Sequence, residues 1–241
     1  MLFKSTNKYI FLLLIHTLYP STALADTSIT ISSGKAGPFV TPEHNGFYDY
    51  IVKEIFQRIG LNAKAELIPS ERSLINADTG INDGNIARIK GIEKKYPNLI
   101  MVPEKIINYE FVAFTKNKNI KITNWKDLEN YNVAYITGWK IFEKNVNQYK
   151  SIIKTQNVTQ LFELLHKDRV DIILYDRWGG VWKSKQFTSN IFHLDPPIVS
   201  KKMYLYVNKK HEKLIPKLSK SIKEIKSDGT YKRFFDITLN N

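Results

Sequence analysis

The chain has 241 residues, a formal net charge of +13 at pH 7 and no cysteine. This length allows one large domain or two smaller lobes with cores of their own. The absence of cysteine excludes disulfides, so packing alone must hold the fold together, which fits a bacterial periplasm better than a small extracellular scaffold.

The first 25 residues are typical of a secretory signal peptide. Lys4 and Lys8 precede the apolar run Tyr9–Tyr19, which is about half as long as the ~20 residues that span a bilayer. The small residues of Ala23–Ala25 then form a cleavage signal. We therefore expect cleavage after Ala25 and a periplasmic location for the mature protein.

The positive charge does not predict a nucleic-acid partner. Removal of Lys4 and Lys8 with the signal peptide lowers the net charge from +13 to +11. The remaining lysines are scattered, and the denser set from Lys201 to Lys232 fits the solvated face of an amphipathic helix. We interpret the charge as a source of solubility and of attraction for anions.

The first part of the mature chain alternates predicted strands and helices. The strands are expected at Ser28–Ser32, Ala63–Ile68, near Ile86, at Leu99–Val102 and at Tyr109–Thr115, and the helices at Tyr48–Ile59, from Ser70 to Gly80 and around Gly91–Tyr96. This order favours a mostly parallel sheet with helices on its faces.

The pattern restarts after the polar run Lys116–Lys121. Asn124 is expected to cap a short helix, strands are expected at Asn132–Ile136, Val170–Tyr175, Ile191–Leu194 and Met203–Val207, and helices at Trp139–Val146, Thr159–Lys167, Trp178–Lys185, Glu212–Lys226 and Thr230–Leu239. We therefore predict an α/β protein whose first lobe combines residues 26–115 with residues 200–241, and whose second lobe, residues 116–199, is inserted. Two crossings near Thr115 and Ser200 would form a hinge beside an interlobe cleft.

The segment Ile68–Arg88 resembles one side of a small-molecule site. Pro69-Ser70 begins its helix, and Arg72 and Arg88 lie on short elements that meet at tight turns. A guanidinium group offers a planar set of donors that matches a carboxylate. The alternative, that both arginines are ordinary surface residues, stays open from the segment alone.

The mature chain resembles the periplasmic solute-binding proteins of the amino-acid-binding type, known as extracellular solute-binding family 3. The resemblance rests on an ordered set of segments: Pro38–Phe39, Gly46–Gly60, Gly80–Asp83, Val133–Gly138, Val170–Asp176 and Lys226–Phe235. It implies the two-lobed periplasmic-binding-protein fold of type II.

The resemblance also implies a ligand site between the lobes. It places the amides at Thr137 and Gly138 against the ligand carboxylate, assisting an arginine, and Asp176 against the ligand ammonium. The chain departs from the family where Gly91–Lys94 replaces the usual threonine-x-x-arginine, so Arg88 or Arg72 would have to substitute. Trp139 also stands where the family has a small hydroxyl residue, and both departures put a standard α-amino acid ligand in question.

Aromatic and titratable residues complete the candidate set. Tyr48, Trp139 and Trp178 could stack on a ligand or belong to the core. The five histidines have no metal spacing, and we expect no metal, cofactor or catalytic nucleophile. Glu71, Glu43 and Lys140 are the candidates for a general acid or base, and nothing in the sequence pairs them.

These observations predict a monomeric binding protein rather than an enzyme. It would close on a small polar solute, such as an amino acid or a related carboxylate, and deliver it to an inner-membrane ABC permease or a sensor. The alternatives are a cyclohexadienyl-dehydratase-like lyase on the same scaffold and a signalling or assembly protein that takes no ligand.

Overall fold

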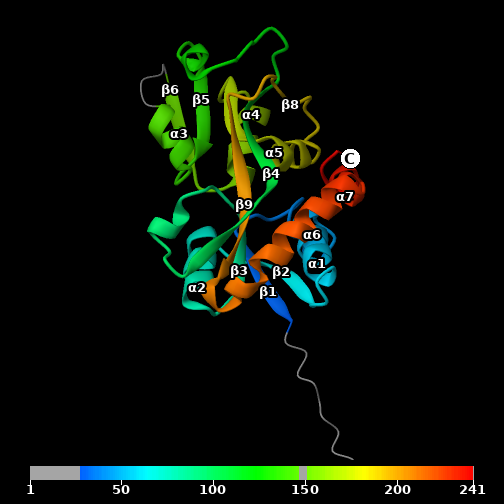
Figure 1. Ribbon diagram of the computed structural model, residues 1–241. Helices are drawn as coiled ribbons and strands as arrows, with labels where there is room; N and C mark the ends of the chain where they lie inside the picture. The colour runs from blue at the N-terminus through cyan, green and yellow to red at the C-terminus, as the bar shows by residue number, and fades with distance from the viewer. Residues whose placement is uncertain (1–27, 147–150, 241) are drawn as a thin grey trace, which may run out of the picture.

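The computed structural model describes residues 28–146 and 151–240, so the predicted signal peptide lies outside the described residues. Figure 1 shows two lobes, connected by strands that run the length of the molecule. The strands are β1 (Ile29–Ser33), β2 (Ala63–Leu67), β3 (Gly84–Arg88), β4 (Leu99–Thr115), β5 (Asn132–Ile136), β6 (Ser151–Thr155), β7 (Ile172–Asp176), β8 (Phe192–His193) and β9 (Val199–Asn208). The α-helices are α1 (Phe47–Gln57), α2 (Ser70–Thr79), α3 (Lys140–Asn145), α4 (Val158–His166), α5 (Arg177–Ser184), α6 (Ile215–Ser227) and α7 (Thr230–Leu239). Three short 3₁₀ helices, η1 (Ile92–Lys94), η2 (Trp125–Leu128) and η3 (Lys209–Leu214), lie between them.

One sheet runs through both lobes in the order β2-β1-β3-β9-β4-β7-β5-β6, with β8 beside β4. The pairs β1/β2 and β1/β3 in one lobe and β5/β6 and β5/β7 in the other are parallel. The pairs that join the lobes, β3/β9, β4/β9 and β4/β7, are antiparallel. The two-lobed α/β fold predicted from the sequence is therefore confirmed. The expectation of a mostly parallel sheet holds within each lobe but not where the lobes join, because the long strands β4 and β9 pair antiparallel.

Strands β4 and β9 form the connection between the lobes. β4 pairs with β9 from Leu99 to Phe111 and with β7 from Phe111 to Phe114, so it belongs to both lobes. The predicted lobe limits at Thr115 and Ser200 fall at the end of β4 and near the start of β9.

Two sequence predictions differ from the structure, one in β4 and one at the start of α6. Leu99–Val102 and Tyr109–Thr115 are one continuous strand, because register shifts in the β4/β9 ladder accommodate the polar residues around Pro103, which has no N–H to donate. The single helix predicted at Glu212–Lys226 is instead η3 followed by α6, whose first turn contains Pro216.

Strand β6 is not predicted by the sequence analysis, although it pairs with β5 over its whole length. Its five residues, SIIKT, contain only two consecutive apolar side chains, and none of its first three residues is fully buried. Such a short edge strand has a weak local signal, and its position depends on pairing with β5.

The lobes are packed by large apolar side chains on both faces of the sheet. In the first lobe α1 presents Ile51, Val52 and Ile55 to the core, and α6 adds Leu218 and Ile222.

Among the helices of the described residues, none has the length and hydropathy needed to cross a bilayer.

Candidate functional site

A cavity of about 420 Å³ lies between the lobes, a volume that suits a small ligand. The first lobe contributes the loop after β1, with Lys35, Gly37 and Phe39, and Ser70 at the start of α2. The second lobe contributes Thr137 to Trp139 after β5, Val158 at the start of α4, Tyr175 and Asp176 at the end of β7, and Gly179, Trp182 and Lys183 on α5. The cavity therefore lies at the carboxyl ends of the parallel strands, where open α/β sheets bind ligands.

Two glycines allow the loop after β1 to approach its neighbours closely. A Cβ atom added at Gly34 would lie 2.7 Å from Cα of Ser70, and one added at Gly37 would lie 3.0 Å from the ring of Trp182. Trp182 belongs to the second lobe, so the loop after β1 contacts both lobes. Any larger side chain at Gly34 would displace the loop that carries Lys35.

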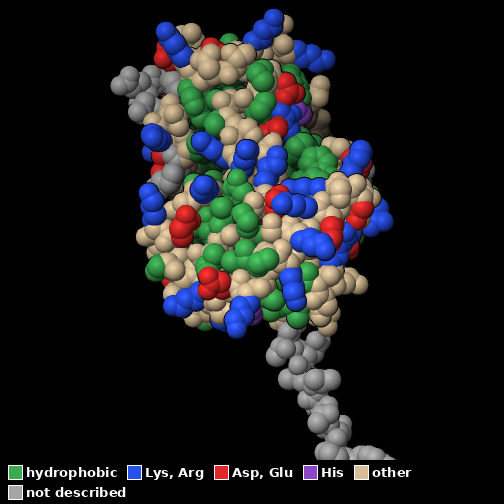
Figure 2. Space-filling model, in the orientation of Figure 1, with side chains coloured by type: hydrophobic (Ala, Val, Ile, Leu, Met, Phe, Trp, Pro, Cys, Tyr) green, Lys and Arg blue, Asp and Glu red, His purple; other side chains and the backbone are tan. Residues whose placement is uncertain are grey.

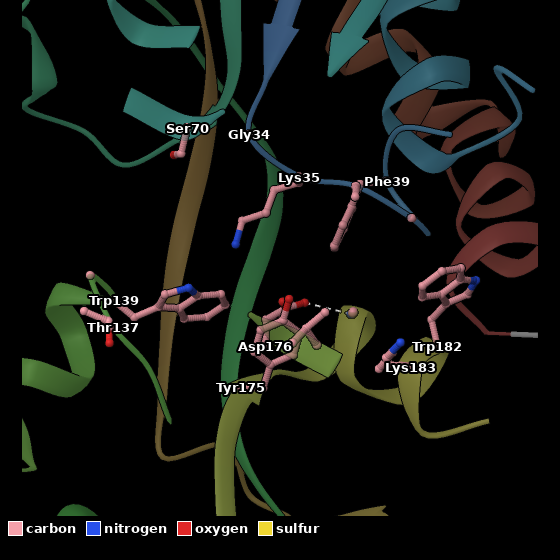
Figure 3. A pocket seen from close by; sticks show the side chains of 15 residues that line it. Gly34, Lys35, Phe39, Ser70, Thr137, Trp139, Tyr175, Asp176, Trp182 and Lys183 are labelled. Carbon is pink, nitrogen blue, oxygen red and sulfur yellow. Dashed lines mark hydrogen bonds between the residues drawn. The ribbon is translucent and has the colours of Figure 1, made fainter. Parts of the chain in front are cut away.

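Lys35 extends from this loop into the cavity (Figure 3). Its Nζ atom lies 4.8 Å from the ring centroid of Tyr109 on β4 and 4.2 Å from that of Trp139. Both rings offer a negative face to the ammonium group. Burial lowers the pKa of Lys35, and the charge of Asp176 opposes this shift.

Asp176 is the acidic side chain of the cavity lining, and it is 1 % exposed. It caps α5, since its Oδ1 accepts a hydrogen bond of 2.8 Å from the amide of Gly179. Oδ2 is buried without a hydrogen-bond partner at standard geometry. Burial raises the pKa of Asp176, and the charge of Lys35 is the largest influence that lowers it.

Two tyrosine hydroxyls are buried in the surroundings of Asp176. The hydroxyls of Tyr48 and Tyr109 have no hydrogen-bond partner at standard geometry, and burial followed by the charge of Asp176 raises both pKa values. Tyr48 does not line the cavity, but its ring stacks on Phe39, which does, at 4.8 Å between centroids. It supports the cavity wall from behind.

Trp139 forms an aromatic wall of the second lobe. Its ring stacks on Phe142 at 5.5 Å and lies 4.7 Å from the ring of Tyr175. Trp139 and Tyr175 both line the cavity and are partly buried. The wall offers a flat apolar surface to a ligand.

The amides expected to bind an anion are engaged within the protein. The N–H of Thr137 donates to the carbonyl of Thr155 at 2.9 Å, that of Gly138 to Oε1 of Glu143 at 2.8 Å, and that of Trp139 to the carbonyl of Ile136 at 3.3 Å. Thr137 and Gly138 nevertheless line the cavity.

Arg88 lies behind the cavity wall rather than in its lining. Nε donates to Oδ1 of Asn85 at 2.6 Å, Nη1 to Oγ of Ser70 at 3.0 Å, and Nη2 to Oγ of Ser73 at 2.8 Å and to the carbonyl of Ser70 at 3.0 Å. Burial lowers the pKa of Arg88, although neighbouring tyrosines, Tyr96 first, oppose this shift. Most of its donors are thus already used to hold the start of α2.

The remaining two candidates lie away from the cavity. Arg72 is exposed on α2 and is not part of the lining. Trp178 lines a different cavity, of about 320 Å³, and its ring meets Phe235 edge to face at 4.9 Å. The structure therefore brings together Thr137, Gly138, Trp139 and Asp176, but not Arg72, Arg88, Tyr48 or Trp178.

Several lining residues were not singled out by the sequence analysis, above all Lys35. A lysine between two nearby glycines, Gly34 and Gly37, directly after a strand is a usable signal, because such loops lie at the ligand edge of a parallel sheet. Tyr175 and Trp182, and the buried Tyr109 beside Lys35, had no comparable signal, since aromatic residues in or after strands are common in cores. The described residues contain no cluster of histidine, aspartate and glutamate suited to a metal ion.

Comparisons with solved structures agree with the two-lobed fold. No family model matches the chain. A protein of Shewanella oneidensis, described as uncharacterized, is 28% identical over 235 residues and covers 86% of this chain and 84% of its own. An ancestral arginine-binding protein, solved with glutamine bound, superposes with a TM-score of 0.69 at 18% identity and covers 89% of this chain and 98% of its own. An ancestral amino-acid-binding protein, described as a precursor of cyclohexadienyl dehydratase, superposes with a TM-score of 0.69 at 15% identity and covers 88% of this chain and 95% of its own. The chain therefore has the two-lobed fold of the family 3 solute-binding proteins.

Proposed function

We propose that this protein binds a small polar, carboxylate-bearing solute in the cavity between its lobes. The observation that carries the proposal is a single cavity lined from both lobes, with a lysine and an aspartate at its centre and aromatic rings along its wall. The structural relatives that bind amino acids support a ligand of this size and polarity.

The two connecting strands supply the mechanism of closure. Strands β4 and β9 are the extended segments that cross between the lobes, and bending at their register shifts would move one lobe against the other. A ligand that contacts both lobes stabilises the closed arrangement by its extra contacts there. We propose that the closed, monomeric protein delivers the solute to an inner-membrane ABC permease in the periplasm, after removal of a signal peptide ending at Ala25. A sensor is the alternative recipient.

A thermal-shift screen of the purified protein tests the binding proposal. The panel holds amino acids, organic acids, short peptides, polyamines and sugars. A ligand bound between the lobes should raise the melting temperature progressively with concentration, because binding to the folded state alone shifts unfolding by mass action. Trp139→Ala, which removes the cavity wall, should weaken the response. The absence of any response across the panel would contradict the proposal.

An enzyme on the same scaffold is a second candidate. A buried carboxyl group with a raised pKa beside a lysine ammonium is an arrangement that could transfer protons, as a dehydratase-like lyase requires. The acids considered from the sequence do not support it, since Glu43 is exposed outside the lining and Glu71 is bonded to Lys95 and Tyr96. The side chain of Lys140 lies outside the described residues.

Recovery of the bound compound distinguishes the two candidates. A hit from the screen is incubated with the protein and then analysed by mass spectrometry. We expect the compound to be recovered unchanged after prolonged incubation with excess protein, as for a binding protein. Conversion that stops in Asp176→Asn would identify an enzyme instead.

A further inference from the structure

The cavity has one charged donor that is not committed to a hydrogen bond. Arg88 is held by Ser70, Ser73 and Asn85, and the amides of residues 137–139 are used within the protein. Lys183 donates to Gln186 at 2.8 Å. Lys35 forms no hydrogen bond with any described residue, although its ammonium group can donate three.

The position of Lys35 suits the reception of an anion. Its ammonium group lies over the rings of Tyr109 and Trp139, which stabilise the cation without using its N–H groups. Figure 3 shows the group directed into the space between Trp139 and Asp176. A ligand carboxylate in that space would form charge-assisted hydrogen bonds with Lys35 in surroundings where water competes weakly.

Among the described residues that line the cavity, the acceptor for a ligand ammonium would be Asp176, and Lys35 already lies beside it (Figure 3). Asp176 is the acid of the lining and is 1 % exposed. Its Oδ1 accepts a hydrogen bond from the Gly179 amide, and its Oδ2 is buried without a hydrogen-bond partner at standard geometry. Its charge is already balanced through space by Lys35. A ligand ammonium at Asp176 would lie beside the ammonium group of Lys35 (Figure 3), and two like charges repel strongly at low dielectric.

We propose that Lys35 is the anion-binding residue of the cleft, and that its ammonium group occupies the position beside Asp176 that the ammonium group of an amino-acid ligand would otherwise take. The site then selects small carboxylic acids with a flat or apolar body, which can lie along Trp139 and Tyr175, over α-amino acids of the same shape. This inference rests on the proposed binding function and narrows its ligand class.

Matched ligand pairs test the proposal by calorimetry with the purified protein. Each pair differs by one amino group: hydrocinnamate and L-phenylalanine, isocaproate and L-leucine, glutarate and L-glutamate. For at least one pair we expect the acid to bind about tenfold or more tightly than the amino acid, the size of effect expected for one unpaired buried charge. Lys35→Met should weaken acid binding by a similar factor, and Lys35→Arg should retain it.

A control and the possible outcomes make the test decisive. Lys154→Met removes an exposed lysine that lies 5.8 Å from the ring of Tyr135 outside the cleft, so it should leave binding unchanged. If the amino acids bind more tightly than the acids, or if Lys35→Met binds the acids as wild type does, the inference is wrong while the binding function stands. If no acid, amino acid, peptide, amine or sugar binds, both the inference and the proposed binding function are wrong. Melting curves of each variant show that lost binding is not lost folding.

Discussion

Arg88 donates two hydrogen bonds to Ser70, one to its hydroxyl and one to its carbonyl, each of 3.0 Å. Ser70 is the first residue of α2 and lines the cavity, whereas Arg88 does not. The arginine at the end of β3 therefore fixes the position of a cavity residue that is 18 positions earlier in the chain.

This relationship predicts that Arg88→Lys destabilises the fold. A lysine ammonium cannot match the planar guanidinium that bonds Ser70, Ser73 and Asn85 together, and leaving these partly buried partners unpaired should cost about 1–3 kcal/mol. Urea unfolding measures the change. The control is Arg72→Lys on the exposed side of the same helix, which should unfold as wild type does.

The same pair of variants tests the role that the sequence predicts for Arg88. If Arg88→Lys keeps wild-type stability but loses ligand binding, Arg88 acts on the ligand directly, in place of the family's arginine that is absent from this sequence. If it loses stability and affinity together, its role is to hold Ser70. The geometry favours the second result, because four of its hydrogen bonds are to the protein.

Substitution of Asp176 by asparagine and by alanine separates the contribution of its helix cap to stability from the contribution of its charge. Asparagine keeps an oxygen that can accept from Gly179, whereas alanine removes the cap of α5, at a cost of about 1 kcal/mol. We therefore expect Asp176→Ala to be less stable than Asp176→Asn by about this amount in urea unfolding at neutral pH. Equal stability of the two variants would show that the cap contributes nothing.

The pH dependence of Asp176→Asn follows from the direction of the pKa shift. Folding raises the pKa of Asp176, so above the pKa of the unfolded chain the folded state binds more protons than the unfolded state. The contribution of this group to stability therefore falls as the pH rises through that window. Melting curves from pH 4 upward should show wild type losing stability relative to Asp176→Asn, and the opposite trend would contradict the assignment of burial as the cause.

Local sequence signals were sufficient for much of the fold and for part of the site. Gly80 ends α2 in the left-handed conformation, with φ of 82°, as its position predicted. The apolar run in NVAYI placed β5, and the apolar run before Asp176 placed that residue at the end of β7. Each of these features depends on a turn residue or an apolar pattern within about ten positions of the chain.

The remaining features depend on contacts between distant parts of the chain. Lys35 gains its role only because Trp139 and Tyr109 come to lie beside it, and nothing near Lys35 in the sequence indicates either ring. Arg88 is held outside the lining because Ser70, Ser73 and Asn85 accept its hydrogen bonds. The local sequence predicts the type of side chain at an edge of the sheet, but long-range packing decides which donor stays unbonded.

Gly180 on α5 should not tolerate a methyl group. A Cβ atom added there would overlap the ring of Phe114, which is fully buried on β4. We expect Gly180→Ala to destabilise the protein by about 1–3 kcal/mol, since a close-packed core absorbs added volume only by strain. In a Phe114→Leu background, where the ring is absent, the added methyl should cost markedly less. An equal cost in both backgrounds would mean that the clash with Phe114 is not the reason.

Acid unfolding should respond to the ion pair between Asp228 and Arg58, whose Oδ2 and Nη1 atoms lie 2.6 Å apart. The amide of Thr230 and the guanidinium of Arg58 lower the pKa of Asp228 to about 2. Because the unfolded carboxyl takes up its proton near pH 3.9, the stability contributed by Asp228 is complete above that pH and is lost as the pH falls toward 2. Asp228→Asn should therefore lose less stability than wild type between pH 5 and pH 2 in melting experiments. Arg58→Met should reduce the pH dependence in the same window. Adding Asp228→Asn should remove the part that the Thr230 amide sustains, so the double variant should change by less than the sum of the two single variants, because both remove the Arg58–Asp228 interaction. Fully additive effects would show that the two side chains act independently.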